Sequence, residues 1–267
     1  MKGFSVPSFA IVLAVATLVA RGGVSPLPPA QSGAGTIKGH IQVGGKLQGN
    51  TVIRMGKDPK CADMNKGKQV VQEIVKATVD GSLANVFVRL EGTFPSSPVP
   101  KTSVVVNHSG CVYQPRVVGV RVGQMLEIRN SDNLLHNVHS VSYHGNEFNV
   151  AQAKAGSVDS FKMKSEEVML HLGCDVHSWM MAYVGVVTNP YFAVSDASGT
   201  FVINNVPPGT YTIDTWHERY GPLKKTVKVT AGATATVDFS YTGSEPKPSA
   251  KNIEDSAPRI AGEKLPS

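Results

Sequence analysis

The sequence predicts an all-β protein. Helical periodicity is nearly absent along its 267 residues, whereas short runs of alternating apolar and polar residues recur between Gly, Pro, Asn and Asp. A Val-rich stretch at 69–76 is the one place where a helical turn is expected. The predicted strands are residues 36–43, 85–90, 103–106, 117–122, 125–129, 157–162, 168–173, 183–187, 200–203, 210–215, 223–229 and 233–241.

The N-terminus has the layout of a secretory signal peptide. Lys2 precedes an apolar run at 9–20, and Arg21 opens a stretch rich in Pro, Gly and Ser. The apolar run is too short to span a bilayer comfortably, but no residue trio fits a cleavage site well, so an uncleaved anchor stays open as an alternative. We therefore expect a protein that is periplasmic or otherwise exported.

Export changes how the three cysteines are interpreted. Oxidising compartments favour disulfides, and an odd number of cysteines leaves one thiol over. Cys61 and Cys111 are candidates for a pair, and Cys174 is then the thiol best explained by metal binding. Three buried free thiols are the alternative.

The formal net charge of +6 is moderate. It suggests solubility and docking to an acidic partner. No block of Lys and Arg is interleaved with aromatic residues, so the sequence gives no indication of nucleic-acid binding.

Strand phase places the candidate thiol on the core side. Alternation over 168–174 predicts one face made of Val168, Leu170, Leu172 and Cys174. The strand at 125–129 likewise directs Leu126 and Ile128 to one side before the chain enters the loop that ends at His136. If the ends of these strands meet at one pole of a sandwich, His136 and Cys174 come together.

The segment from Cys174 to Met181 offers a thiolate, an imidazole and a thioether within eight residues. His136 can supply a second imidazole. Two His, one Cys and a weak axial Met are the ligands of a blue-copper site, because soft sulfur favours Cu(I) and imidazole suits both oxidation states. The predicted ligands of one copper ion are His136, Cys174, His177 and Met180, with Met181 as the alternative axial ligand.

Residues 101–190 resemble a cupredoxin. The resemblance rests on residues 110–117 and 120–124, on the loop at 130–138 and on the ligand loop at 174–181. It implies that His136 is the first ligand, and that Asn137 is similar to the residue that ties the two ligand loops together.

The ligand loop resembles two kinds of copper protein. Its spacing from His177 to Met180 is similar to that in the copper-binding subunit of cytochrome oxidase, and from His177 to Met181 to that in azurin. The oxidase subunit uses two Cys in one loop for a dinuclear centre, whereas Cys174 stands alone here. The resemblance therefore implies a mononuclear site.

The flanking segments resemble the carboxypeptidase regulatory-like domain, a transthyretin-type sandwich. Residues 194–201, 206–213 and 227–239 carry this likeness, and 37–44 resemble its opening strand. The resemblance implies a discontinuous sandwich into which the cupredoxin is inserted, an arrangement similar to that of cupredoxin-like proteins labelled methylamine-utilisation-related. The expected parts are a signal peptide and linker at 1–30, N-terminal sandwich strands at 36–100, the cupredoxin at 101–190, C-terminal sandwich strands at 191–242 and a disordered tail at 243–267.

The remaining polar clusters favour structural roles. His139 is expected at the surface or beside a ligand, and its exchange with His136 stays open. In the run Trp216-His217-Glu218, Trp216 is expected to plug a core, with the His and Glu as a hydrogen-bonded rim; a contact surface or weak metal site is the alternative. The histidines expected to be solvated are His40, His108, His144 and His171.

Two other uses of Cys174 and His177 are less favoured. A structural zinc site would normally draw more Cys and His and no Met. Nucleophilic catalysis by Cys174 would need a third group to orient His177, and the sequence offers no evident candidate.

The predicted function is one-electron shuttling between Cu(I) and Cu(II), without catalysis and without a small-molecule substrate. The expected partners are a redox protein donor and acceptor, with a membrane-bound respiratory complex as one candidate. An exposed edge of His177 is expected to lie in an apolar docking patch made of Leu134, Leu135, Trp179 and Met181. The alternatives are a non-redox copper carrier, a scaffold subunit of a redox complex, and an enzyme whose copper has an open position.

Overall fold

The structure, a computed structural model, describes residues 1, 33–45, 47, 49–246 and 248. The predicted signal peptide and most of the predicted tail lie outside these residues. The described chain forms seventeen strands, one 3₁₀ turn and one short α-helix, which confirms the all-β prediction. Within this part of the chain, no helix is long and apolar enough to cross a membrane.

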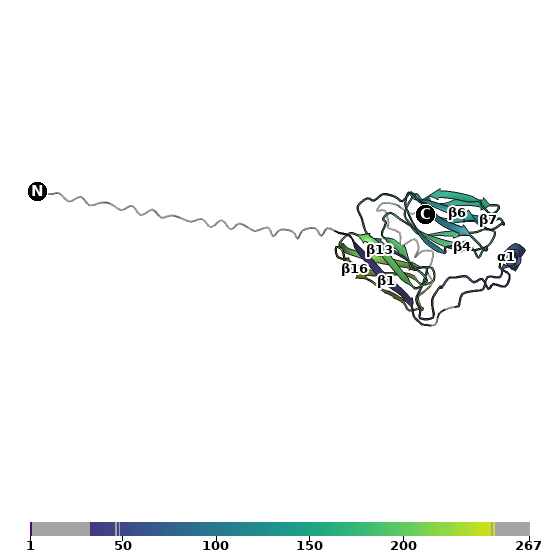
Figure 1. Cartoon of the computed structure of the whole chain (residues 1–267), viewed down its shortest axis with the longest axis horizontal. Coiled ribbons are helices and arrows are strands. Elements are labelled where there is room, and N and C mark those ends of the chain that lie inside the picture. Colours follow the sequence, from purple (N-terminus) through teal and green to yellow (C-terminus); the bar gives the residue numbers. More distant parts are fainter. Residues whose placement is uncertain (2–32, 46, 48, 247, 249–267) are drawn as a thin grey trace, which may run out of the picture. The chain divides into compact units, whose positions relative to one another are not determined.

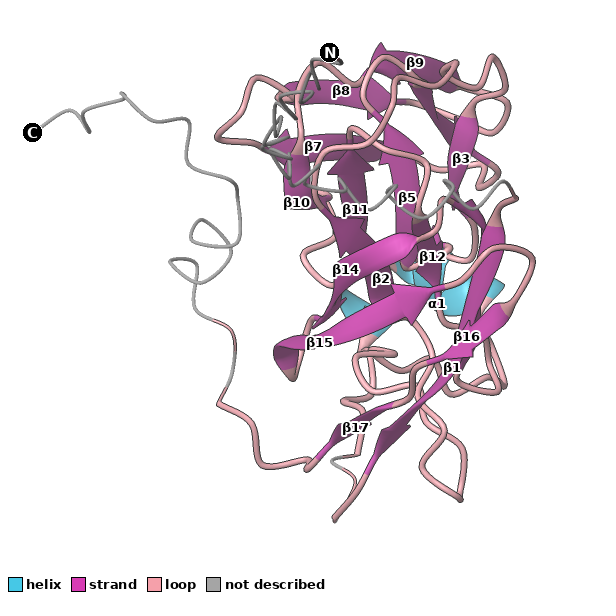
Figure 2. Cartoon of the chain, turned by 90° about the vertical axis from the view of Figure 1, so that its left-hand side faces the viewer, coloured by secondary structure: helices cyan, strands magenta, loops and turns pink. Residues whose placement is uncertain are grey.

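Two sheets are built from strands near both ends of the described chain. In the first, β1 (Gly35–Val43) lies between β13 (Thr200–Val206) and β16 (Thr234–Thr236), and it also pairs with β17 (Phe239–Tyr241). The second has the order β12 (Phe192–Val194), β2 (Phe87–Glu91), β14 (Gly209–His217) and β15 (Gly221–Val229). Apolar residues of both sheets enclose one core, so we call the pair the outer sandwich (Figure 2). Its largest buried members include Ile37, Ile41, Leu90, Phe201 and Phe239.

The strands between residues 104 and 187 form two further sheets. One has the order β4 (Tyr113–Gln114), β3 (Val104–His108), β6 (Met125–Asn130) and β9 (Val158–Lys162). The other has the order β5 (Val117–Arg121), β11 (Met181–Val187), β10 (Glu167–Gly173), β7 (His136–Val141) and β8 (Phe148–Gln152). Leu126 and Ile128 of β6 face Leu170 and Leu172 of β10 in a shared core, as their alternation predicts. We call this pair of sheets the inner sandwich.

Each predicted strand has a counterpart, although the last is divided into β16 and β17. The short strands β4, β7, β8 and β12 are not foreseen by the sequence. The predicted helical turn at 69–76 is wrong, because this Val-rich stretch is extended and Val71 pairs with Val52. The helix is instead α1 (Pro59–Met64), where Asp58 caps the first amides and Pro59 takes the first helical position.

The inner and outer sandwiches pack tightly against each other. Gly119 in β5 and Gly185 in β11 lie under the rings of Phe192 and Phe87, and a Cβ at Gly185 would stand 2.3 Å from the Phe87 ring. Trp216 is buried in the same cluster, so its predicted role as a core plug is confirmed. Val168 also packs here rather than in the inner core, because β10 shifts register between Glu167 and Leu170.

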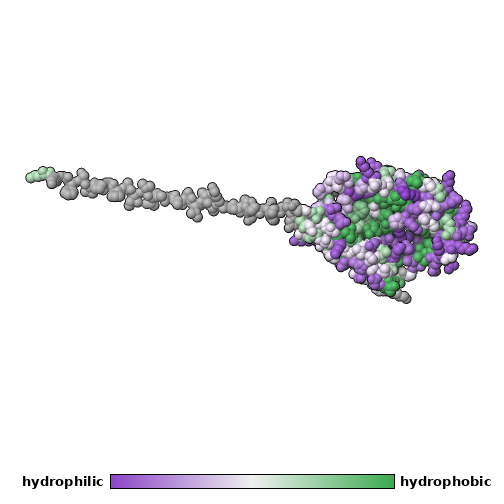
Figure 3. All heavy atoms as spheres, in the orientation of Figure 1, coloured by the Kyte–Doolittle hydropathy of each residue, from purple (hydrophilic) through white to green (hydrophobic). Residues whose placement is uncertain are grey.

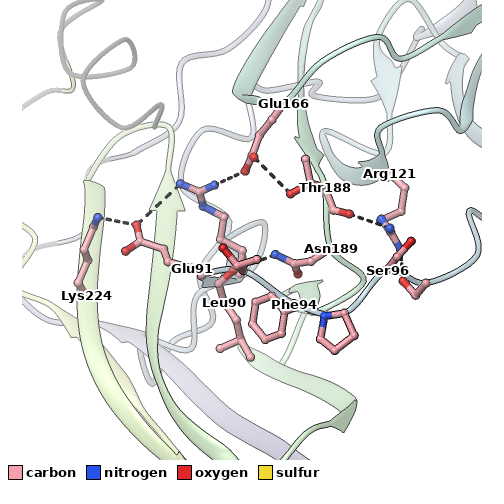
Figure 4. A pocket seen from close by; sticks show the side chains of 14 residues that line it. Leu90, Glu91, Phe94, Ser96, Arg121, Glu166, Thr188, Asn189 and Lys224 are labelled. Carbon is pink, nitrogen blue, oxygen red and sulfur yellow. Dashed lines mark hydrogen bonds and ion pairs between the residues drawn. The ribbon is translucent and has the colours of Figure 1, made fainter. Parts of the chain in front are cut away.

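Charged residues join the two sandwiches as well. Arg89 Nη1, in β2, lies 2.8 Å from Glu166 Oε1, next to β10, and at the edge of the inner sandwich Arg121 donates to the Thr188 carbonyl oxygen at 2.7 Å (Figure 4). These residues line a cavity of about 750 Å³ whose polar groups largely pair with one another. Because sheets built from 35–91 and 192–241 flank those built from 104–187, we propose the discontinuous domain plan that the sequence predicts.

Between β1 and β2, residues 49–79 form an arm that leaves the outer sandwich and crosses to one pole of the inner sandwich (Figure 1). The Ile53 amide donates to the Val70 carbonyl oxygen at 2.9 Å and joins its two sides. The tip carries a 3₁₀ turn, η1 (Met55–Lys57), and the helix α1. A disulfide between Cys61 and Cys111 fixes the tip to the loop between β3 and β4, which confirms the predicted pairing.

Candidate metal centre

Three buried side chains converge at the pole that the arm covers. His136 begins β7, Cys174 directly follows β10, and His177 lies in the loop that leads to β11. Because β7 and β10 are hydrogen-bonded neighbours, their ends bring these residues together. The sequence predicts that His136 and Cys174 meet, but it does so from the strand at 125–129, which as β6 lies in the other sheet. One ligand atom from each residue lies within 4.8 Å of the others. Nδ1 of His136 is 3.1 Å from Nδ1 of His177, and Cys174 Sγ is 3.8 Å from that same nitrogen.

The two methionines after His177 differ in burial. Met180 is 2% exposed and packs in the same apolar cluster as Cys174, and its amide donates to the His177 carbonyl oxygen at 2.8 Å. Met181 begins β11 and is partly exposed, although both methionines line the same surface groove. This difference favours Met180 as the thioether of the centre.

Each imidazole is held from its far side by a carboxylate. Asp132 Oδ2 lies 2.9 Å from His136 Nε2, and Asp58 Oδ2 lies 3.0 Å from His177 Nε2. When Nε2–H donates to a carboxylate, Nδ1 keeps its lone pair free for a metal. Both rings therefore present the nitrogen that faces Cys174.

The disulfide supports both carboxylates. The amide of Cys61 donates to Asp58 Oδ1 at 3.2 Å, and the amide of Cys111 donates to Asp132 Oδ2 at 2.8 Å. A second amide, that of Gly110, donates to Asp132 Oδ1 at 2.8 Å. Each half of the bridge thus fixes one carboxylate and, through it, one imidazole.

Asn137 joins the two ligand loops, as the cupredoxin resemblance implies. Its Nδ2 donates to Asp175 Oδ2 at 2.9 Å, and its Oδ1 accepts from the Asp175 amide at 2.5 Å. His139 lies on the outer side of the same carboxylate, 3.0 Å from Asp175 Oδ1, and is not part of the converging group.

The electrostatics of the pole suit a metal-binding thiolate. Burial alone would raise the pKa of Cys174, but hydrogen bonds with His136 and with the amides of Asn137 and His177 lower that pKa to about 7. Burial would lower the pKa of His136, but the hydrogen bonds to Asp132 and Cys174 raise it to about 9, so a metal that binds Nδ1 near neutral pH displaces a proton from this ring. Since a metal binds the deprotonated thiol, a lowered thiol pKa favours metal binding near neutral pH.

Three expectations about this pole are wrong. His177 is not exposed but 1% accessible, because Asp58 and the Trp179 ring, 5.0 Å away between centroids, cover it. The expected apolar patch is divided accordingly, since Leu134 is buried against the disulfide. The sequence also offers no evident group to orient His177, whereas the structure shows that Asp58 does so. Cys174 is only 6% exposed, and this burial argues against a role as a catalytic nucleophile.

Two histidines expected at the surface are buried. His108 is inaccessible because β3 runs on to residue 108, which puts His108 on the same face as Val106. Its ring lies 5.0 Å from that of His136, and burial lowers its pKa to about 3. His217 is enclosed by Tyr220 and Tyr241 rather than lying at a rim. Of the others, His144 is exposed, while His40 and His171 are half-buried.

The donor set fits copper. Two imidazole nitrogens, a thiol of lowered pKa and a neighbouring thioether match the ligands that hold copper in both oxidation states. Two other groups, Asp58 with Cys61 and His177, and Cys111 with Asp132 and His136, also lie close enough for a metal. Their sulfur atoms are joined in the disulfide, so neither offers a thiolate.

Residues 182–242 match the sequence model of the carboxypeptidase regulatory-like domain. The match begins within β11 and continues over β12 to β17. A search of the curated proteins finds no match.

Several solved structures are similar to part of the chain. The copper-containing nitrite reductase of Thermus scotoductus SA-01 is 17% identical, with 36% of this chain and 24% of the reductase covered and a TM-score of 0.30. The novel purple cupredoxin of Nitrosopumilus maritimus is 20% identical, with 31% and 97% covered and a TM-score of 0.27. An oxidised amicyanin variant is 24% identical, with 35% and 96% covered and a TM-score of 0.28. The chain thus spans about a quarter of the reductase. As the sequence predicts, residues 182–242 are similar to the carboxypeptidase regulatory-like domain, and part of the chain is similar to cupredoxins.

Proposed function

We propose that this chain is an exported mononuclear copper protein that carries single electrons between redox partners. The observation that carries the proposal is the convergence of His136, Cys174 and His177 at one buried pole, with Met180 in the same cluster. Copper bound there supplies a one-electron couple between Cu(I) and Cu(II).

The protein's part is to hold one ligand geometry for both oxidation states. The strands fix the starting points of both ligand loops, and Asn137 links the loops directly. Asp58 and Asp132 fix the orientation and tautomer of the two imidazoles. Side chains held in this way reorganise little when a metal changes its charge, which favours rapid electron exchange.

The structure supports a carrier of electrons over a carrier of copper. A protein that delivers copper must release it, whereas the four predicted ligands are at most 6% exposed and lie at the pole that the disulfide-bonded arm covers. The alternative of an enzyme whose copper has an open position would need a further histidine beside the metal. His139 instead pairs with Asp175, and His144 is exposed.

The visible absorption spectrum tests the proposal. After addition of Cu(II), the wild-type protein should show an intense copper–thiolate absorption band at about 600 nm that is lost in Cys174→Ser. A colourless protein that still binds copper would favour the copper carrier or scaffold subunit. A protein that does not bind copper would refute the metal centre itself.

A further inference from the structure

The tip of the arm is strongly basic. Residues 54–68 contain an excess of three positive charges. The five basic side chains are all exposed, and among the described residues none of them has an ion-pair partner. Hydrophilic residues cover the edge of the molecule where α1 lies (Figures 1 and 3). The basic residues are Arg54, Lys57, Lys60, Lys66 and Lys68, and the acidic ones are Asp58 and Asp63.

Asp58 connects this basic surface to the metal centre. Its Oδ2 lies 3.0 Å from His177 Nε2, so it touches the ring of a predicted ligand. The Asp58 side chain is 22% exposed, whereas that of His177 is 1% exposed. Lys57 precedes Asp58 directly, and Lys60 follows two positions later. Two exposed cations therefore lie within two residues of Asp58 in the chain.

We infer that the basic tip of the arm is the docking surface for an acidic face of a redox protein, which approaches the metal centre at Asp58. The inference rests on the proposed function and replaces the apolar patch expected around an exposed His177. Charge attraction raises the rate of encounter more than it raises affinity, and brief contacts of this kind suit electron exchange.

The other approach to His177 passes Trp179. This ring lies in the wall of a groove of about 780 Å³. Of the three cations that line the groove, Arg116 pairs with Glu218 and Lys76 pairs with Glu73, whereas Lys68 belongs to the basic tip. The groove should therefore attract an acidic partner less strongly than the tip does. Docking at the groove is the alternative that the tests below distinguish from docking at the tip.

The first test measures electron exchange of the copper-loaded full chain with two c-type cytochromes, one acidic and one basic. Lys57→Glu combined with Lys60→Glu reverses two charges beside Asp58. The control, Lys38→Glu with Lys228→Glu, makes the same change in net charge on β1 and β15 of the outer sandwich, where both lysines are exposed.

We expect the tip variant to lower the second-order rate constant with the acidic cytochrome about tenfold at low ionic strength, and less at high ionic strength. The control should lower it far less, and the basic cytochrome should not be slowed by either variant. Equal slowing by the tip and control variants would overturn the inference, because only net charge would then matter.

The second test does not depend on copper. The paramagnetic anion hexacyanochromate(III) is added to the metal-free protein, and the broadening of each backbone amide signal is measured by NMR. Broadening centred on residues 54–68 supports the tip, and the tip variant should abolish it. Broadening centred on Trp179 and the groove, or spread evenly over all exposed lysines, would contradict it. Because this measurement uses the metal-free protein, it can refute the proposed docking surface independently of whether the metal centre binds copper.

Discussion

Among the described residues, buried histidine lies in two clusters of side chains, and one of these two has the form of a metal centre. At the pole of the inner sandwich, His136 and His177 turn their Nδ1 atoms toward each other and toward Cys174. In the outer sandwich, His217 is equally buried but lies between Tyr220 and Tyr241, and its Nδ1 accepts from the Arg219 amide. Burial of an imidazole alone therefore does not indicate a metal ligand. The indication is the convergence of several donor atoms, with each imidazole fixed by a hydrogen bond to a carboxylate on its far side.

Removal of a donor from the first cluster should have the largest effect. His177→Ala should abolish the blue absorption and weaken copper binding, because it removes one of the three converging donors. His171→Ala, which removes a ring that lies tilted beside Tyr183, and His217→Phe should leave both intact. Copper titration followed by visible absorption measures all three variants, and equal effects would refute the assignment.

Removal of the disulfide should have the second-largest effect, because it should lower both the stability of the protein and its copper affinity. In the double variant Cys61→Ala and Cys111→Ala, the arm is released and both carboxylates lose their support. We expect the free energy of unfolding to fall by about 2–5 kcal/mol and copper affinity to fall with it. Urea unfolding and a competitive copper titration measure the two quantities. An unchanged affinity would show that the imidazoles are held without the bridge.

The carboxylates behind the imidazoles should matter less than the ligands themselves. Asp58→Asn and Asp132→Asn should each weaken copper binding by about 10- to 100-fold, because the amide no longer fixes the ring tautomer. Asp63→Asn is the matched control, since this residue of α1 is exposed and lies outside the groups of donors around His136 and His177. If all three variants bind copper alike, the carboxylates do not position the rings.

The second cluster should be detected by pH rather than by metal. Burial, together with Arg116 and Arg219, lowers the pKa of His217 to about 3, whereas an unfolded His titrates near 6.5. Between these values only the unfolded chain takes up the proton, so this residue costs up to about 1.4 kcal/mol of stability per pH unit as the pH falls below 6.5. His217→Phe should reduce that slope in urea unfolding between pH 7 and pH 5. Exposed His144→Gln should not, and identical slopes in all variants would contradict the burial argument.

Local patterns were sufficient to predict that His136 and Cys174 meet at one buried pole. The alternation in 168–174 puts Cys174 on the core side of β10, and the position of His136 at a strand end brings it to the same pole. With Cys174 assigned to the metal, Cys61 and Cys111 remained as the candidate pair, and they form the disulfide. Asp132 could also have been found, because it precedes His136 by four residues in the same loop.

Features that depend on distant contacts were missed. Asp58 lies 119 residues from His177, and its position at the start of α1 reveals only its role as a cap. The arm crosses to the pole because of the disulfide and these long-range bonds, so the burial of His177 could not be read from its own loop. The error at His108 has a smaller cause, since two further residues of β3 reverse its expected exposure.

X-ray absorption at the copper edge tests the central claim most directly. For the copper-loaded full chain, the account predicts one ion per chain with one short sulfur neighbour and two imidazole nitrogens, and loss of the short sulfur in Cys174→Ser. Copper surrounded only by nitrogen and oxygen, or bound by sulfur that remains in Cys174→Ser, would contradict the assignment of His136, Cys174 and His177 as its ligands.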